Sequence, residues 1–142
     1  MSKVMLWTVM ACFMFSSISC VMIVKEEERG PYDPGCISSD PVIAEIDAVA
    51  DLSFDSHRHD AYKRIAEREG LSEPAQVHLV NQALKHLSFE NMKESVLLAL
   101  IENDSFTCEA QRAILSQLKK LNFENTKQSI LSAIDQHNPC AD

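Results

Sequence analysis

The chain has 142 residues, which is room for one domain of ordinary size. Its apolar fraction is 46% and it contains only three glycines, a composition typical of a compact helical protein and not of a disordered one. The formal net charge of −8 argues against a protein that binds the phosphate backbone of nucleic acid, because that function needs clustered Lys and Arg.

The chain begins with an apolar leader. Residues 4–24 are apolar apart from one Thr and three Ser, with Lys3 before them and a charged run after them. A positive start, an apolar run and a tail of small residues predict a signal peptide over residues 1–20. The same segment is long enough to remain as a membrane anchor, and its cysteines also permit lipid attachment. Each alternative predicts a secreted, periplasmic or envelope-bound protein.

The rest of the chain divides into a linker and a helical domain. Residues 21–39 combine two prolines, two glycines and a run of charges, and are predicted to be a linker. Over residues 40–138 apolar residues recur at helical spacing, and the alternation of a strand is absent. Asp40, Ser72 and Thr107 are suitable N-caps at the starts of such stretches. We expect about six helices here, forming an all-α domain of three stacked helical hairpins.

One seven-residue motif occurs three times, at intervals of 35 and 34 residues, a period typical of stacked repeats. Its copies are residues 52–58, 87–93 and 121–127, where one helix of each hairpin is expected to turn into the next. The third residue of each copy is Phe. We expect these rings to lie in the cleft between the two helices, where burial of an aromatic ring contributes about 2–3 kcal/mol. They are Phe54, Phe89 and Phe123.

The polar positions of the motif have expected roles as well. The acidic residue after the Phe lies near the positive end of the next helix dipole, and the residue after it is the expected cap. These caps are Ser56, Asn91 and Asn125. The basic residue at the end of the motif pairs with the acidic residue or covers the ring. Alternatively, the three basic residues form an evenly spaced row that binds an acidic partner; they are Arg58, Lys93 and Lys127.

A cluster of polar residues in the first motif is a candidate for metal binding. It contains His57, His59 and Asp60. His57 and Asp60 have the i, i+3 spacing of metal ligands on a helix, whereas His59 points elsewhere. The competing interpretation is a solvated helix start, and we assign no metal ligands.

The five cysteines include two in the leader, which leaves Cys36, Cys108 and Cys140 in the remaining chain. Cys36 and Cys140 lie just outside the two ends of the repeat region and form a possible disulfide. Cys108 is expected to be a small apolar residue at the start of a helix. The odd number of cysteines also permits a bond between chains.

The ordered repeats resemble a bacterial family, the domain of unknown function numbered 4476. The resemblance covers residues 40–137 and rests on three segments, which are 54–58 with Ala61-Tyr62-Lys63, 87–93, and the copy around Phe123. The polar run at 57–60 departs from the family pattern. The resemblance implies a helical fold and export, and it implies no catalytic residues and no known ligand. The period also matches tetratricopeptide repeats, but their Trp-containing signature is absent.

No motif for catalysis is present in the sequence. It lacks a nucleophile elbow, a Gly-rich phosphate loop and a CxxC pair, so we expect neither an enzyme nor a cofactor. Stacked hairpins usually bind proteins or peptides. We therefore expect a non-catalytic, secreted or envelope-associated module with a protein or peptide partner. The alternatives are a small metal-binding or enzymatic protein that uses His57, His59 and Asp60, and an envelope structural protein linked by disulfides.

Overall fold

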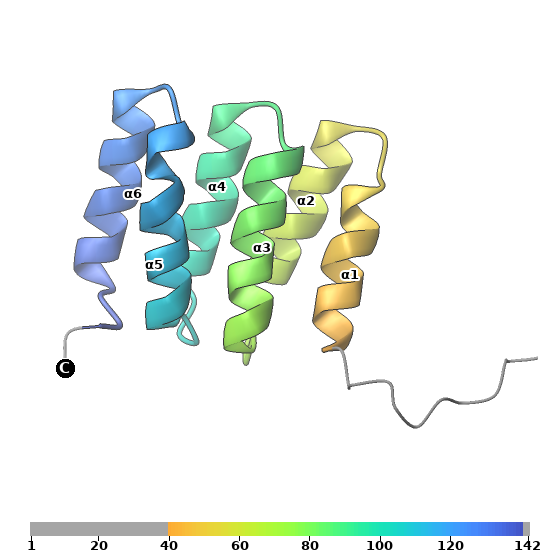
Figure 1. Cartoon of the computed structure of the whole chain (residues 1–142), viewed down its shortest axis with the longest axis horizontal. Coiled ribbons are helices and arrows are strands. Elements are labelled where there is room, and N and C mark those ends of the chain that lie inside the picture. The colour runs from red at the N-terminus through yellow and green to blue at the C-terminus, as the bar shows by residue number, and fades with distance from the viewer. Residues whose placement is uncertain (1–39, 141–142) are drawn as a thin grey trace, which may run out of the picture. The chain divides into compact units, whose positions relative to one another are not determined.

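The computed structural model describes residues 40–140, and this part of the chain is helical without a strand (Figure 1). Its elements are α1 (Pro41–Ala50), α2 (Asp55–Ala66), α3 (Glu73–His86), α4 (Glu90–Ile101), α5 (Cys108–Gln117), the 3-10 turn η1 (Leu118–Lys120) and α6 (Glu124–Gln136). The prediction of an all-α protein with six helices is confirmed for the described residues. The predicted leader and linker, residues 1–20 and 21–39, lie outside them.

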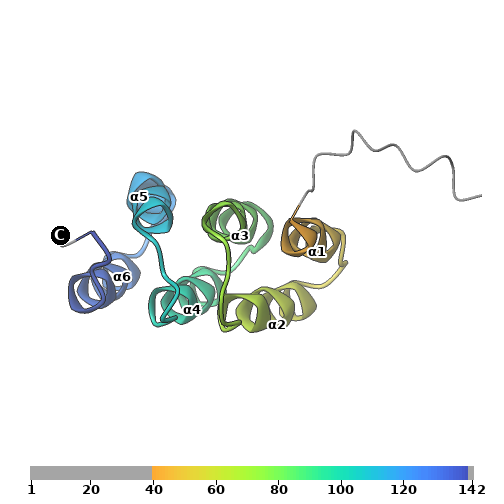
Figure 2. The same ribbon diagram turned by 90° about the horizontal axis from the view of Figure 1, so that it is seen from below.

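The helices form two layers (Figure 2). In one layer α1 packs on α3 and α3 packs on α5, and in the other α2 packs on α4 and α4 packs on α6. The three turns within the hairpins therefore lie along one edge of the stack (Figure 1). None of the helices in the described part is long and apolar enough to span a membrane.

The odd-numbered helices begin at the predicted caps. The carboxylate of Asp40 accepts a hydrogen bond from the Val42 amide at 2.9 Å, with Pro41 in the first turn, where its missing N–H is not needed. The hydroxyls of Ser72 and Thr107 accept hydrogen bonds from amides three residues on, both at 3.3 Å. These starts are predictable because the contacts are local in sequence.

The even-numbered helices begin differently from the prediction. Their N-cap residues are the three phenylalanines of the motif, and none of these helices has a side-chain cap. The expected caps were wrong, and the residues concerned are Ser56, Asn91 and Asn125. They lie inside the first turn of their helices, two positions after the N-cap, which is too late for a side chain to cap the free amides.

The three phenylalanines are also exposed, which corrects their predicted burial. Phe54, Phe89 and Phe123 are 65%, 58% and 59% exposed. In the second and third corners the leucine two residues earlier is buried, since Leu87 and Leu121 are only 2% and 3% exposed, whereas Leu52 of the first corner is 38% exposed. Each Phe has an extended backbone at the N-cap position, so it precedes its helix and is not part of the helix's inward stripe of apolar side chains.

The core lies between the layers and consists of aliphatic residues from all six helices, with Tyr62 as its one fully buried aromatic ring among the described residues. The buried face of α2 has the helical spacing of its apolar residues and consists of Ala61, Tyr62, Ile65 and Ala66. All buried apolar residues of the described part lie between Ile46 and Ile134. Residues 40–140 therefore hold a complete core and form a self-contained folding unit.

Candidate functional site: the corner edge

The three motif copies lie along one edge of the stack, which we call the corner edge and define as residues 50–58, 84–93 and 117–127. The turns α1–α2, α3–α4 and α5–α6 form this edge (Figure 1). Each turn brings the end of one helix close to the beginning of the next. The edge therefore presents three copies of one local structure, spaced by the stacking of the repeats.

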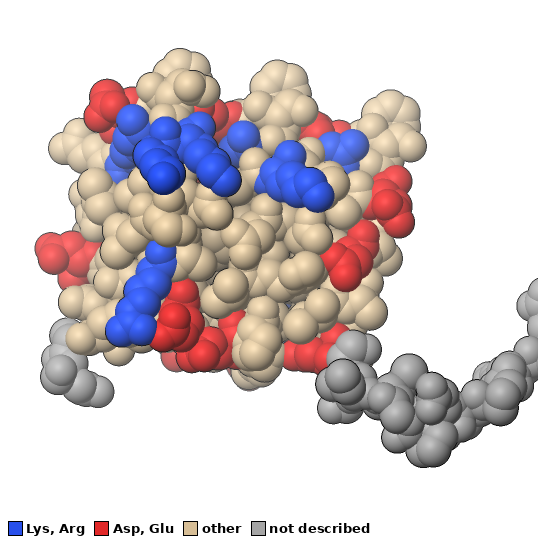
Figure 3. Space-filling view, viewed as in Figure 1, with Lys and Arg blue, Asp and Glu red and all other residues tan. Residues whose placement is uncertain are grey.

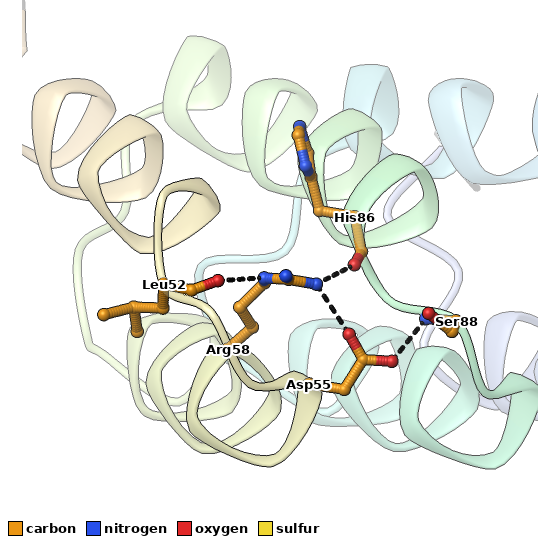
Figure 4. A network of polar contacts seen from close by, with 5 residues as sticks. All are labelled: Leu52, Asp55, Arg58, His86 and Ser88. Carbon is orange, nitrogen blue, oxygen red and sulfur yellow. Dashed lines mark hydrogen bonds and ion pairs between the residues drawn. The ribbon is translucent and has the colours of Figure 1, made fainter.

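Arg58 holds the first corner to the second (Figure 4). Its Nε donates to the carbonyl of Leu52 at 2.7 Å, and one terminal nitrogen donates to the carbonyl of His86 and to the carboxylate of Asp55, both at 2.6 Å. The carbonyl of His86 is at the end of α3, where such groups lack a partner within the helix. Arg58 is thus a structural residue that closes the last turn of α3.

The acidic residue of each motif binds the backbone of the following corner. The second carboxylate oxygen of Asp55 accepts a hydrogen bond from the amide of Ser88 at 2.9 Å. In the next repeat the carboxylate of Glu90 accepts hydrogen bonds from the amides of Asn122 at 2.5 Å and Phe123 at 2.9 Å. These bonds join residues 32 or 33 apart. These bonds were not predicted from the sequence, although an acidic residue recurs in it at one repeat interval.

These contacts lower the pKa values of both carboxyls. The Ser88 amide holds the pKa of Asp55 below its ordinary value. Burial by itself raises the pKa of Glu90, but the hydrogen bonds from the amides of Asn122 and Phe123 outweigh it and hold the pKa below its ordinary value. Both side chains are therefore held as carboxylate anions, and as anions they accept the hydrogen bonds that join successive repeats.

The other two members of the predicted basic row have different surroundings. The ammonium of Lys127 lies 2.7 Å from the carboxylate of Glu124, three residues before it in the same helix. Lys93 is half-buried, has no hydrogen-bond partner among the described residues, and lies near enough to Asp55 and Glu90 to help lower the pKa of each. The structure thus places Arg58, Lys93 and Lys127 at equivalent positions, with Arg58 the most firmly bound.

The exposed rings are the most unusual feature of the corner edge. A lone exposed apolar residue is ordinary on a protein surface, but here the same large residue is exposed at the same position of three repeats. The ring of Phe54 makes an edge contact with the ring of His57, with centroids 5.5 Å apart. We call Phe54, Phe89 and Phe123 the aromatic row.

The corner edge is also richer in positive charge than the rest of the domain. It holds six basic and four acidic residues, whereas the turns at the opposite edge, residues 66–73, 101–109 and 135–140, hold one basic and seven acidic residues. Figure 3 shows Lys and Arg gathered along the corner edge on the face in view, and most Asp and Glu away from it. Because two of the four acidic side chains are bonded to backbone amides, the edge presents mainly positive charge to a partner.

The predicted polar cluster does not assemble into a metal site. The Nδ1 atom of His59 lies 3.0 Å from the carboxylate of Asp60, while His57 contacts Phe54. Among residues 40–140 no three His, Cys, Asp or Glu side chains are placed to hold one metal ion. His59 and Asp60 are thus in direct contact, and His57 and Asp60 line one hollow on the surface of α2.

A disulfide lies at the opposite edge and corrects the predicted pairing. It joins Cys108, at the start of α5, to Cys140, after the end of α6. Because Cys140 is bonded there, its predicted bond to Cys36 is wrong, and Cys36 itself lies outside the described residues. The interpretation of Cys108 as a small apolar residue was also wrong. The reason is that α5 and α6 are antiparallel, so the tail after α6 returns to the beginning of α5.

Comparison of the chain with protein-family models, with curated proteins and with solved structures finds no match. The resemblance to the domain of unknown function numbered 4476 accordingly stays a prediction based on the repeated motif.

Proposed function

We propose that this protein is a non-catalytic, secreted or envelope-associated module that binds a protein or peptide partner through its corner edge. The observation that carries the proposal is the aromatic row, three phenyl rings that remain in solvent at equivalent positions of three repeats. A ring that is about 60% exposed contributes little to the core of its own domain. The same ring contributes about 2–3 kcal/mol when a partner buries it.

Aromatic residues are typical anchors of protein interfaces, because they offer a large apolar area with few rotatable bonds. The stack fixes the backbone at Phe89 and Phe123 through the hydrogen bonds of Asp55 and Glu90 to the following corner, and Arg58 holds the first corner through the carbonyl of Leu52. The aromatic row is therefore held in place before a partner binds, which lowers the entropy lost on binding. An extended peptide or a surface with regularly spaced apolar pockets fits such a row.

The charge of the corner edge favours an acidic partner. Its basic surplus contrasts with the acidic edge opposite and with the net charge of −8 for the whole chain. An acidic partner is attracted to the corner edge and repelled by the other, which orients the encounter. Lys93 and Lys127 are proposed contacts to such a partner, and Arg58 contributes mainly by fixing the first corner.

Site-specific crosslinking tests this proposal. A photoreactive residue is placed in turn at Phe54, Phe89 and Phe123, and as matched controls at Asp104 and His137, which are exposed but lie outside the aromatic row. In the cell that makes the protein, we expect one and the same partner to be attached at two or more positions of the aromatic row and at neither control.

Crosslinks that form equally at the control positions would refute the corner edge as the site, as would their absence from all three rings. A charge-reversal variant, Lys93→Glu with Lys127→Glu, supplies a second test. It is expected to reduce crosslinking to an acidic partner, and raising the salt concentration is expected to do the same, since a Debye length is only about 8 Å at physiological ionic strength.

A further inference from the structure

The end of the stack formed by α5 and α6, which we call the C-terminal face, retains the groups that elsewhere bind a following repeat. In the second repeat the carboxylate of Glu90 binds the corner of the third. Its counterpart in the third repeat is Glu124, and the side chain of Glu124 is 86% exposed. The acidic residue at this end thus has no following corner to bind within its own chain.

At the opposite edge a buried glutamine likewise binds the following repeat, and its counterpart in the last repeat has no partner. Gln76, at the start of α3, accepts a hydrogen bond from the amide of Thr107 at 3.0 Å and donates to the carbonyl of Ser105 at 2.6 Å, both in the following repeat. Its counterpart in α5 is Gln111. The side-chain oxygen of Gln111 is buried and has no hydrogen-bond partner among the described residues.

Apolar residues on the C-terminal face are exposed where their counterparts are covered. Leu115 and Leu131 are 40% and 47% exposed, whereas Val80 and Leu97 at the equivalent positions of the second repeat are 0% and 1% exposed. A hollow of about 440 Å³ lies beside them, and its lining includes Leu118, Glu124 and Leu131. The face therefore has both the apolar surface and the polar acceptors of an interface between repeats.

The other end of the stack offers the matching donors. In each following corner, the amides next to the Phe bind the acidic residue of the preceding repeat. In the first corner the corresponding amides belong to Ser53 and Phe54, and no described residue accepts a hydrogen bond from either. The exposed carboxylate and the unpaired amides are thus the two halves of one contact, at opposite ends of the same chain.

The register of the stack identifies a further complementary pair. The carboxylate of Glu94 in α4 binds Thr126 in the parallel helix α6. Their counterparts at the two free ends are Gln128 in α6 and His57 in α2. Two helical turns further along, Asp135 of one copy faces Arg64 of the next, and neither residue has an ion-pair partner within the described part of the chain.

From these matches we infer that copies of this chain associate head to tail, with the C-terminal face of one copy on α1 and α2 of the next. The contact reproduces the interface between repeats, so the assembly is open and extends the stack. It is weak and reversible, because the C-terminal face has Ser132 and Asp135 where the second repeat has the more apolar Leu98 and Ile101.

Sedimentation equilibrium of the helical domain, residues 37–142, tests this inference over concentrations from about 10 μM to about 1 mM, the range in which weak contacts form. We expect the average mass to rise past that of a dimer. Leu131→Asp is expected to abolish the rise. Leu131 is exposed in the single chain, so this variant keeps its fold, which circular dichroism verifies.

A charge swap identifies the contact itself. Asp135→Arg and Arg64→Asp each turn an attraction into a repulsion and are expected to weaken association about five- to tenfold. The variant with both changes restores the pair and is expected to associate like the unaltered protein. A monomer at every concentration, a mass that stops at a dimer, or a double variant as weak as the single ones would each overturn the inference.

Discussion

Removal of the disulfide between Cys108 and Cys140 is expected to destabilise the domain strongly. The bond joins residues 32 apart in sequence and encloses α5 and α6. By the chain-entropy relation, a closed loop of this length lowers the entropy of the unfolded chain enough to stabilise the fold by about 3–4 kcal/mol. A domain of this size has a free energy of unfolding of about 5–15 kcal/mol, so the expected loss is a large fraction of the whole.

Urea denaturation followed by circular dichroism measures the effect. Residues 21–142, which include Cys36, are compared with and without reductant, and with a variant that carries both Cys108→Ala and Cys140→Ala. For an m-value of about 1–2 kcal/mol per M, the midpoint is expected to fall by about 2–3 M in both cases. Cys36→Ser is the matched control, and we expect it to change neither the midpoint nor the response to reductant.

The reasoning fails if reductant and the double variant leave the midpoint where it was. It also fails if peptide mapping of the oxidised full chain finds Cys140 joined to Cys36. An unchanged midpoint would mean that the disulfide constrains only a frayed end of the stack. A bond between Cys140 and Cys36 would mean that the tail does not return to the start of α5, and that the packing of the third repeat described above is incorrect.

Three further variants test the corner edge. Arg58→Ala removes three hydrogen bonds and is expected to lower the free energy of unfolding, measured by urea denaturation, by about 2 kcal/mol. Lys93→Ala, at the equivalent position, is expected to change it little. Equal effects of the two variants would contradict the structural role of Arg58. Phe89→Ala is expected to cost less than about 0.5 kcal/mol, because the ring is exposed, and a loss above about 2 kcal/mol would mean that it is buried. The pKa of Glu90 in the folded chain lies below its ordinary value of 4.5. The contribution of Glu90 to the free energy of unfolding is therefore present above pH 4.5 and is lost as the pH falls below that value. Glu90→Gln is therefore expected to flatten the acid limb of stability against pH while Glu124→Gln does not, and identical profiles for the two variants would refute the connecting role of Glu90.

The sequence was sufficient to predict the helices, because the signals that start and stop them are local. Asp40, Ser72 and Thr107 cap the helices that follow them as expected, and the apolar spacing of α2 predicts its buried face. The period of the motif likewise predicts that the hairpins stack. The caps and the buried face depend on residues within a few positions of one another, and the stacking depends on a repeat that is visible along the sequence.

The roles of the corner residues depended on contacts that sequence spacing does not show. The general tendency of aromatic rings to be buried predicts that Phe89 and Phe123 lie in the core, but Leu87 and Leu121 supply the buried side chains of these two corners. Asp55 was assigned to its own helix, whereas its oxygen binds the amide of Ser88, 33 residues later. The pairing of Cys140 depended in the same way on where the tail lies after α6.

The hydrogen bonds between successive corners all run from the amides of one repeat to the acidic residue of the repeat before it. This order affects how such a chain tolerates the loss or gain of a repeat. Each corner receives its acidic contact from the repeat before it, as Ser88 does from Asp55 and Asn122 does from Glu90. Deletion of the last repeat leaves every earlier corner with its contact, but deletion of the first removes the contact of the second. Gene duplications that add repeats find one half of this contact in place at either end, the carboxylate of Glu124 after α6 or the amides of Ser53 and Phe54 in the first corner.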